Sequence, residues 1–126
     1  MGPPWDFDLA FGNFINDYNR YTSWASVGTD DEDSYVKTTW LNYLLQDPAF
    51  TRQLKQRWGE VGNLMLSAAL EEIALQRRLL QQSQRENFSV WNIFGENIAF
   101  ESSETAHITT YDVQLDYIEN FLKNRK

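Results

Sequence analysis

The chain contains no cysteine and only one histidine, His107. Without cysteine it can form no disulfide, and it offers neither a thiolate nucleophile nor a thiolate ligand for a metal. A Ser-His-Asp or Cys-His arrangement would need His107 as its base, and no nucleophile signature accompanies that residue. We therefore expect His107 to lie in a loop or at the surface, without a role as catalytic base or zinc ligand.

Long hydrophobic runs and basic segments are also missing. No apolar stretch approaches the ~20 residues that a membrane-spanning helix needs, and no basic region followed by an apolar core marks a signal peptide. The 11 Lys and Arg residues are outnumbered by 18 Asp and Glu residues, which gives a net charge of −7 at pH 7. We therefore expect no membrane span and no binding of nucleic acid through its phosphates.

The chain does have enough apolar and aromatic side chains, 42% and 15% of its 126 residues, for one domain with a core. Residues 1–33 show no sustained hydrophobic period, so we expect an irregular N-terminal segment. From residue 34 onward apolar residues recur at the helical period, and residues 34–126 should form a helical domain. The predicted fold is all-α, a bundle of about four helices with an irregular N-terminal segment.

Capping signals and glycines predict where helices begin and end. Asp47 followed by proline is typical of a helix start, because the Asp side chain accepts from a free amide and proline has no amide to satisfy. Gly59 and Gly62 predict a break near them. A long helix should then run from about residue 63 to about residue 87. A capping box at Thr109 predicts the start of the last helix.

The apolar faces of these helices predict the hydrophobic core. The expected core residues are Trp40, Phe50, Leu54, Trp58, Leu66, Leu70, Ile73, Leu80, Leu115, Ile118 and Leu122. The aromatic-rich residues 88–95 should pack back against the helices. Arg77 and Arg78 should lie on a solvated helix face, because Gln and Glu surround them.

The most informative segment is residues 2–13, in which Asp6 and Asp8 stand among aromatic residues and a Gly-Asn pair ends the run. Packing two carboxylates near aromatic rings would desolvate like charges side by side, which is costly. A hard cation such as Mg2+ would relieve that cost, because carboxylates are its preferred ligands. A metal site at Asp6 and Asp8 is one interpretation, and an acidic pair in a turn or helix cap is the other.

Five elements, in order, carry a resemblance to a known family. They are the Gly-Pro-Pro-Trp-Asp-Phe-Asp segment at residues 2–8, a Trp, Leu-Leu and Asp-Pro-x-Phe element at residues 40–50, an Arg-Trp element within residues 54–58, an Arg-Glu-Asn-Phe-x-x-Trp element at residues 85–91, and a closing helix at residues 110–125. Together they resemble the C-terminal part of the CotH kinase family, the spore-coat-type atypical protein kinases. We therefore expect the chain to be a piece of a larger protein.

The resemblance implies a place in kinase chemistry. In this family the Trp-Asp-x-Asp segment corresponds to the Asp-Phe-Gly element of ordinary protein kinases, so Asp6 would be the principal Mg2+ ligand, bridging ATP phosphates, and Asp8 a second ligand. The nucleotide-binding lobe, its phosphate-holding Lys and the catalytic Asp would belong to the missing upstream part. The resemblance thus implies Mg2+ and ATP in the intact parent, with neither held tightly by this chain alone.

Three functions fit these patterns. The first is a C-terminal helical subdomain of a CotH-like kinase, contributing a Mg-binding Asp to ATP-dependent Ser phosphorylation of coat or envelope proteins; its partners would be the missing N-terminal kinase lobe and the protein substrate. The second is a non-catalytic helical binding or structural module of a cell-envelope or spore-coat protein. The third, a glycan-binding module, rests on the aromatic content alone.

Two further expectations concern the surroundings of the chain. The resemblance implies the spore coat or the cell envelope of a bacterium as its location. If the N-terminal aromatics lack their partner lobe, an exposed apolar patch should favour self-association. The aromatics concerned are Trp5, Phe7, Phe11 and Trp24.

Overall fold

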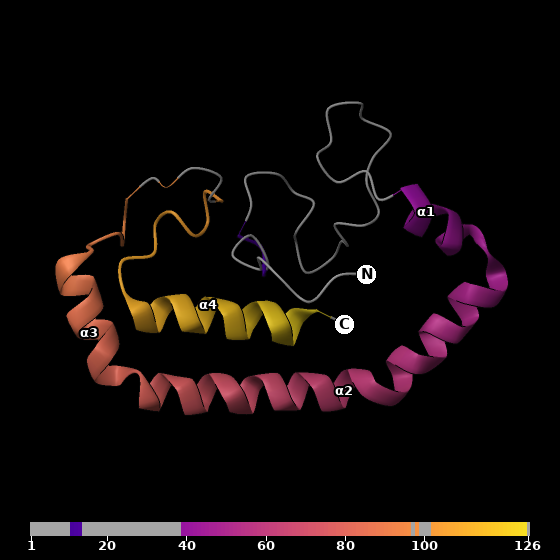
Figure 1. Ribbon diagram of the computed structural model, residues 1–126, viewed down its shortest axis with the longest axis horizontal. Helices are drawn as coiled ribbons and strands as arrows, with labels where there is room; N and C mark the ends of the chain where they lie inside the picture. The colour runs from indigo at the N-terminus through magenta and orange to yellow at the C-terminus, as the bar shows by residue number, and fades with distance from the viewer. Residues whose placement is uncertain (1–10, 14–38, 97, 99–101, 126) are drawn as a thin grey trace.

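The computed structural model describes residues 11–13, 39–96, 98 and 102–125. These residues form four helices and no strand, which confirms the predicted all-α class. The helices are α1 (Thr39–Gln46), α2 (Pro48–Leu79), α3 (Gln81–Val90) and α4 (Tyr111–Asn124) (Figure 1). Residues 34–38, which we expected to belong to the first helix, lie outside the described residues.

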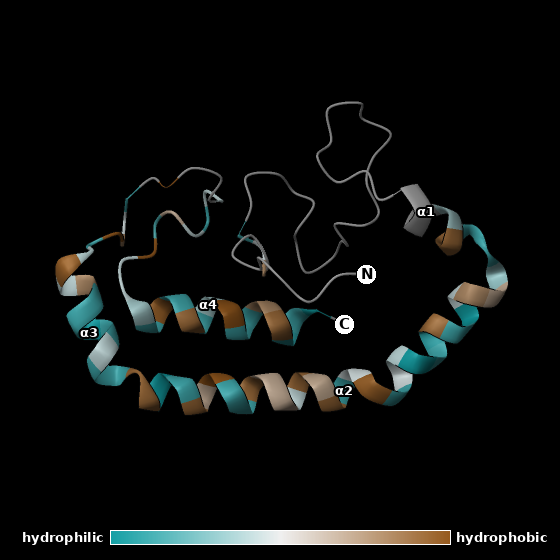
Figure 2. Cartoon of the chain, viewed as in Figure 1, coloured by the Kyte–Doolittle hydropathy of each residue, from teal (hydrophilic) through white to brown (hydrophobic). Residues whose placement is uncertain are grey.

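The long helix α2 is the base on which the other helices are arranged. α4 runs beside the C-terminal part of α2 in the opposite direction, while α1 and α3 continue the chain at the two ends of α2 (Figure 1). With 14 residues against 32 and a rise of about 1.5 Å per residue, α4 can cover less than half of α2. Apolar and hydrophilic residues alternate along both helices, as expected for helices with one covered face (Figure 2).

The start of α2 is as predicted. Pro48 occupies the first helical position, and the backbone amide of Ala49 donates a 2.7 Å hydrogen bond to Oδ1 of Asp47. The Asp47 side chain therefore satisfies one of the amides that have no partner within the helix.

The predicted break at Gly59 and Gly62 is wrong, because α2 continues through both residues. A glycine costs about 1 kcal/mol relative to alanine within a helix, and a helix of 32 residues rich in Leu, Ala, Glu and Gln tolerates that cost. The axis of α2 does bend along its length (Figure 1). Gly62 lies under the Trp58 ring, where an added Cβ would be 3.1 Å from a ring carbon.

Two other helix ends differ from the prediction. The helix expected over residues 63–87 is divided at Leu80, whose ψ of 5° departs from the helical value and separates α2 from α3. The cap of α4 is Thr110, one residue after the expected Thr109, and its Oγ1 accepts a 3.3 Å hydrogen bond from the amide of Val113. In both places the backbone torsion at a single residue decides the boundary.

The hydrophobic core within the described residues is small. Only Ile108 and Phe121 are buried apolar side chains there. The assignment of Leu54, Trp58 and Leu80 to the core is wrong, because all three are exposed. The side chain of Trp40 lies outside the description, and the other predicted core residues are half-buried: Phe50, Leu66, Leu70, Ile73, Leu115, Ile118 and Leu122.

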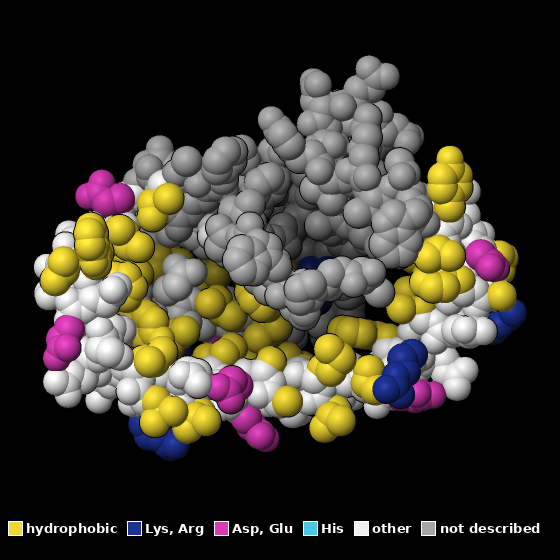
Figure 3. Space-filling model, in the orientation of Figure 1, with side chains coloured by type: hydrophobic (Ala, Val, Ile, Leu, Met, Phe, Trp, Pro, Cys, Tyr) yellow, Lys and Arg dark blue, Asp and Glu magenta, His cyan; other side chains and the backbone are white. Residues whose placement is uncertain are grey.

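Fewer residues are buried than predicted because α4 runs beside only the C-terminal part of α2. Hydrophobic periodicity identifies the apolar face of a helix, but it carries no information on how much of that face another element covers. Apolar side chains accordingly reach the surface over α3 and over the first part of α2 (Figure 3). Within the described part of the chain, no helix is both long enough and apolar enough to span a membrane.

Residues 88–95 return toward the helices only in part: Phe88 and Phe94 make aromatic contacts, whereas Val90, Trp91 and Ile93 are exposed. The ring centroids of Phe88 and Phe94 are 4.3 Å apart, and Phe88 lies 6.1 Å from Tyr111 at the start of α4. The amide of Gly95 also donates a 3.0 Å hydrogen bond to the carbonyl of Ile108. These contacts join the end of α3 to the start of α4.

Candidate functional site

The predicted metal ligands Asp6 and Asp8 lie outside the described residues. Among the residues that are described, no group of three or more His, Cys, Asp or Glu side chains could hold a metal ion. His107 is exposed in the turn before α4, as predicted. Any such group in this chain would include residues outside the described ranges.

The end of that N-terminal run is described, and it is attached to the C-terminal part of the chain. Asn13 Oδ1 accepts a 2.7 Å hydrogen bond from Oγ1 of Thr105, which lies 92 residues away in the sequence. Thr105 is only 1% exposed. We call the contacts made by residues 11–13 with residues 102–121 the N-terminal anchor.

Ser102 and Thr105 form the buried polar part of the anchor. Their hydroxyl oxygens are 2.8 Å apart, and the amide of Thr105 donates a 3.2 Å hydrogen bond to Ser102 Oγ. The Thr105 hydroxyl has a single proton, and its shortest contact is the 2.7 Å one to Asn13. When that proton is donated to Asn13, the Ser102 hydroxyl donates to Thr105 in turn. No buried side-chain polar atom of the described residues lacks a partner.

Gly12 forms the tightly packed part of the anchor. Its φ is +84°, and an added Cβ would lie 2.7 Å from Tyr117 Oη and 3.1 Å from the Phe121 ring. Any other residue would be strained there in both its backbone and its contacts. Tyr117 also donates a long, 3.5 Å hydrogen bond to the carbonyl of Gly12.

Phe11 completes the anchor against the same helix. Its ring meets the Phe121 ring edge-on, with centroids 6.0 Å apart and an interplanar angle of 89°. Its φ of +56° lies in the left-handed region, which costs a non-glycine residue about 1–2 kcal/mol. The contacts of Phe11 and Gly12 with α4 must outweigh that cost for the conformation to persist.

A cluster of opposite charges attaches α4 to α2. Arg77 of α2 donates to Asp112, Asp116 and Glu119 of α4 at 3.4, 2.6 and 3.3 Å. The hydrogen bond to Asp116 is the main cause that raises the pKa of Arg77 above its ordinary value. The prediction that Arg77 lies on a solvated face is therefore wrong, whereas Arg78 is exposed.

The carboxylates of this cluster already have cationic partners. The carboxylates at positions 112, 116 and 119 share one helix face, and the guanidinium of Arg77 already lies between them. Lys123 adds a second cation, 3.0 Å from Glu119. The three carboxylates on this face of α4 are thus paired with basic side chains.

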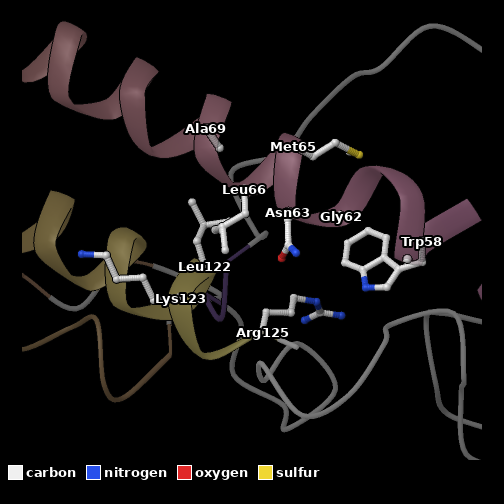
Figure 4. A pocket seen from close by; sticks show the side chains of 10 residues that line it. Trp58, Gly62, Asn63, Met65, Leu66, Ala69, Leu122, Lys123 and Arg125 are labelled. Carbon is white, nitrogen blue, oxygen red and sulfur yellow. The ribbon is translucent and has the colours of Figure 1, made fainter.

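A hollow of about 540 Å³ opens between α2 and the C-terminal end of α4. Apolar side chains of Met65, Leu66 and Leu122 line it, and the Arg125 side chain extends from the end of α4 toward Trp58 (Figure 4). Burial lowers the pKa of Arg125 below its ordinary value, and its guanidinium lies 5.6 Å from the centroid of the Phe121 ring. Among the described residues that line the hollow, apolar side chains predominate and none is a carboxylate.

The sequence contained only part of the signal for the anchor. The Gly-Asn pair at the end of the N-terminal run is typical of a turn, because both residue types tolerate left-handed torsions. Nothing in the sequence indicated that Ser102, Thr105 or Tyr117 would contact that pair, since they lie about 90 residues or more further along the chain.

A protein-family model matches the chain over its whole length. The model of the family described as CotH kinase protein matches residues 1–126. No curated protein and no solved structure matches the chain.

Proposed function

Since the chain belongs to the CotH kinase family, we propose that it is the C-terminal helical subdomain of a CotH-like atypical protein kinase. The family match over the whole chain is the observation that carries this proposal, because it includes the N-terminal run together with all four helices. The reaction of the intact kinase would be ATP-dependent phosphorylation of Ser in coat or envelope proteins. We infer the spore coat or the cell envelope of a bacterium as the location, from the family alone.

Asp6 is proposed as the principal Mg2+ ligand and Asp8 as the second. The chemistry that Mg2+ supplies in phosphoryl transfer is the neutralisation of charge on the phosphate oxygens, and one or two carboxylates are its usual protein ligands. Two observations support this choice of residues. The three carboxylates on one face of α4 are paired with basic side chains, and residues 11–13 attach the end of the same run to α4 and to the turn before it.

The isolated chain should be inactive. Its partners in the intact protein would be an N-terminal kinase lobe, which supplies the phosphate-holding Lys and the catalytic Asp, and the protein substrate. Neither Mg2+ nor ATP should bind tightly without that lobe, because two adjacent carboxylates form an incomplete metal shell. Self-association through N-terminal aromatics stays a prediction; of these, Phe11 is described and is 38% exposed.

The test is phosphoryl transfer by the intact protein that carries this chain. Asp6→Ala should abolish transfer of radiolabelled phosphate from ATP to a Ser-containing substrate, and Asp8→Ala should reduce it less. Asp33→Ala is a matched control, because it removes one carboxylate from the acidic run at residues 30–33. Circular dichroism should show an unchanged helix content in all three variants.

Two results would decide against the kinase interpretation. Full activity of Asp6→Ala would show that this carboxylate does not bind the catalytic metal. No transfer by the unmodified protein, with Mg2+ or Mn2+ and a set of Ser-containing coat proteins, would favour the alternative, a non-catalytic helical module of the envelope or spore coat.

A further inference from the structure

A second hollow, of about 270 Å³, lies where α2 and α3 meet the start of α4. Arg77 and Arg78 of α2 line it, together with Gln81 and Arg85 of α3 and Asp112 of α4. Its lining thus includes three arginines and one carboxylate, and we call it the basic notch. It is separate from the hollow at the C-terminal end of α4, with which it shares no lining residue.

The interruption of the helix at Leu80 creates the notch. Arg78 lies in the last turn of α2 and Arg85 in the middle of α3. In a straight helix, residues seven apart are separated by about 10 Å along the axis. The chain instead turns at Leu80, and α3 rises on the same side of α2 as α4 (Figure 1). The corner therefore lets side chains from two helices line one space that the start of α4 closes.

The arginines of the basic notch differ in whether their charge is already neutralised. Arg77 donates to three carboxylates of α4, so its guanidinium is occupied. Within the described part of the chain, the side chains of Arg78 and Arg85 make no ion pair and no hydrogen bond. Each guanidinium is a planar group of N–H donors that suits the oxygens of an anion such as phosphate. Two such groups are therefore available at the notch.

Uncharged donors lie beside these two guanidinium groups. Gln81 and the half-buried Tyr111 also line the notch, and neither has a side-chain hydrogen bond to the described residues. A lining of guanidinium, amide and phenol groups suits an oxyanion, because its oxygens accept hydrogen bonds. The volume of the notch is below the roughly 300–1,000 Å³ of pockets for drug-sized ligands. A small group therefore fits it better than a nucleotide.

We propose that the basic notch binds a phosphate group, either as free phosphate or as the phosphate ester of a side chain. Arg78 and Arg85 donate to its oxygens, and Gln81 and the Tyr111 hydroxyl add uncharged hydrogen bonds. A phosphate ester carries a charge of roughly −1.5 to −2 at pH 7, which two guanidinium groups neutralise. Asp112 opposes binding, and Arg77 offsets its charge. Neither the proposed metal ligands nor kinase activity is needed for this binding.

The experiment measures the binding of two probes, inorganic phosphate and N-acetyl-phosphoserine amide, to the intact protein by isothermal titration calorimetry. Arg78→Gln and Arg85→Gln should each weaken the binding of the tighter probe by about five- to tenfold, because each removes a charged hydrogen-bond donor. In the NMR spectrum of the arginine side chains, the Nε–H signals of Arg78 and Arg85 should shift together as the probe is added. Circular dichroism should show an unchanged helix content in both variants, since both side chains are exposed.

Arg52→Gln is the matched control. Arg52 is also exposed and makes no ion pair within the described part of the chain, but it lies at the opposite end of α2 from the notch. Its substitution should leave the affinity unchanged. An equal loss in Arg52→Gln would show that the probe responds only to the overall charge and would overturn the inference. An unchanged affinity in both Arg78→Gln and Arg85→Gln, or no saturable binding of either probe, would overturn it as well.

Asp112→Asn should change the affinity in the opposite direction. It removes the carboxylate of the lining and frees part of the Arg77 guanidinium, so the tighter probe should bind at least about twofold more strongly. Weaker binding by this variant would contradict the proposed place of the phosphate. The two probes distinguish the sources of the ligand: tighter binding of the phosphoserine amide would support a phosphorylated side chain, and equal or tighter binding of inorganic phosphate would support free phosphate.

Discussion

The two halves of α2 differ in how much of their apolar surface is covered. In the C-terminal half, Leu66, Leu70 and Ile73 are half-buried on the side that faces α4, and Arg77 ends that side with its ion pairs. In the N-terminal half, Leu54 and Trp58 are exposed although they follow the same helical period. Similar sequence patterns thus give different burial: α4 runs beside the C-terminal half, whereas among the described helices the N-terminal half has only α1, which continues from its end.

The comparison separates helix formation from core formation. Both halves of α2 are helical, because good helix formers and a cap at Asp47 suffice for that. Burial depends on a second element, and three of the best-buried residues of the described chain, Thr105, Ile108 and Phe121, lie in α4 or in the turn before it. Substitutions in the region around α4 should therefore cost more free energy of unfolding than substitutions in the first half of α2.

Phe121→Ala should have the largest effect. Phe121 is 7% exposed and contacts Phe11, so its removal leaves a cavity and frees the end of the N-terminal run. We expect a loss of about 3 kcal/mol in the free energy of unfolding, which is the lower end of the range for replacing a buried Phe by Ala. Urea denaturation followed by circular dichroism measures it; a loss no larger than that of Trp58→Ala would contradict the comparison.

Gly12→Ala should be the next most harmful, at about 2 kcal/mol, because the residue has φ of +84° and no room for a Cβ. The same denaturation measurement applies. In the double variant with Tyr117→Phe, the hydroxyl that would lie 2.7 Å from the new Cβ is absent. The double variant should therefore lose less than the sum of the two single losses; strict additivity would show that contact with Tyr117 is not the cause.

Arg77→Met should cost about 1 kcal/mol, because three carboxylates of α4 lose their common partner and repel one another. The raised pKa of Arg77 means that its contribution is present below the ordinary pKa of arginine and is lost only above the raised value. Titration of Arg77 should thus cause no change in stability between about pH 5 and 9.

The ionic origin of the Arg77 effect can be checked by salt. The difference in unfolding free energy between the unmodified protein and Arg77→Met should shrink in about 1 M NaCl, where the Debye length is about 3 Å. Arg78→Met is the control, since Arg78 is exposed. A loss of equal size in both variants would contradict the ion-pair explanation.

Trp58→Ala should have the smallest effect of the four, below about 1 kcal/mol. The sequence placed Trp58 in the core, and a fully buried tryptophan would make this one of the most harmful substitutions. In the structure, however, the Trp58 side chain is 41% exposed and its ring covers Gly62. The urea midpoint of this variant should lie close to that of the unmodified protein. A loss above 3 kcal/mol would show that the two halves of α2 contribute equally to stability.

The sequence predicted the helical elements better than their ends. Asp47 with its proline marked the start of α2 because the cap needs only neighbouring residues. Gly59 and Gly62 suggested a break that a long helix tolerates, and Leu80 gave no sign of the interruption that it makes. Of the candidate site, the sequence analysis singled out the Gly-Asn pair after the acidic residues but not its contacts, and Ser102 and Thr105 carried no signal of their role.

By itself, the sequence determined the all-α class, the cap of α2, the surface position of His107 and the family, since these follow from local propensity, from helical period and from short motifs in order. The tertiary structure decided which apolar faces are covered, that Arg77 joins three carboxylates, and that residues 11–13 are held by α4 and the turn before it. These features depend on contacts between residues far apart in the chain. Neither period nor propensity encodes such contacts, because both describe only the nearest neighbours along the sequence.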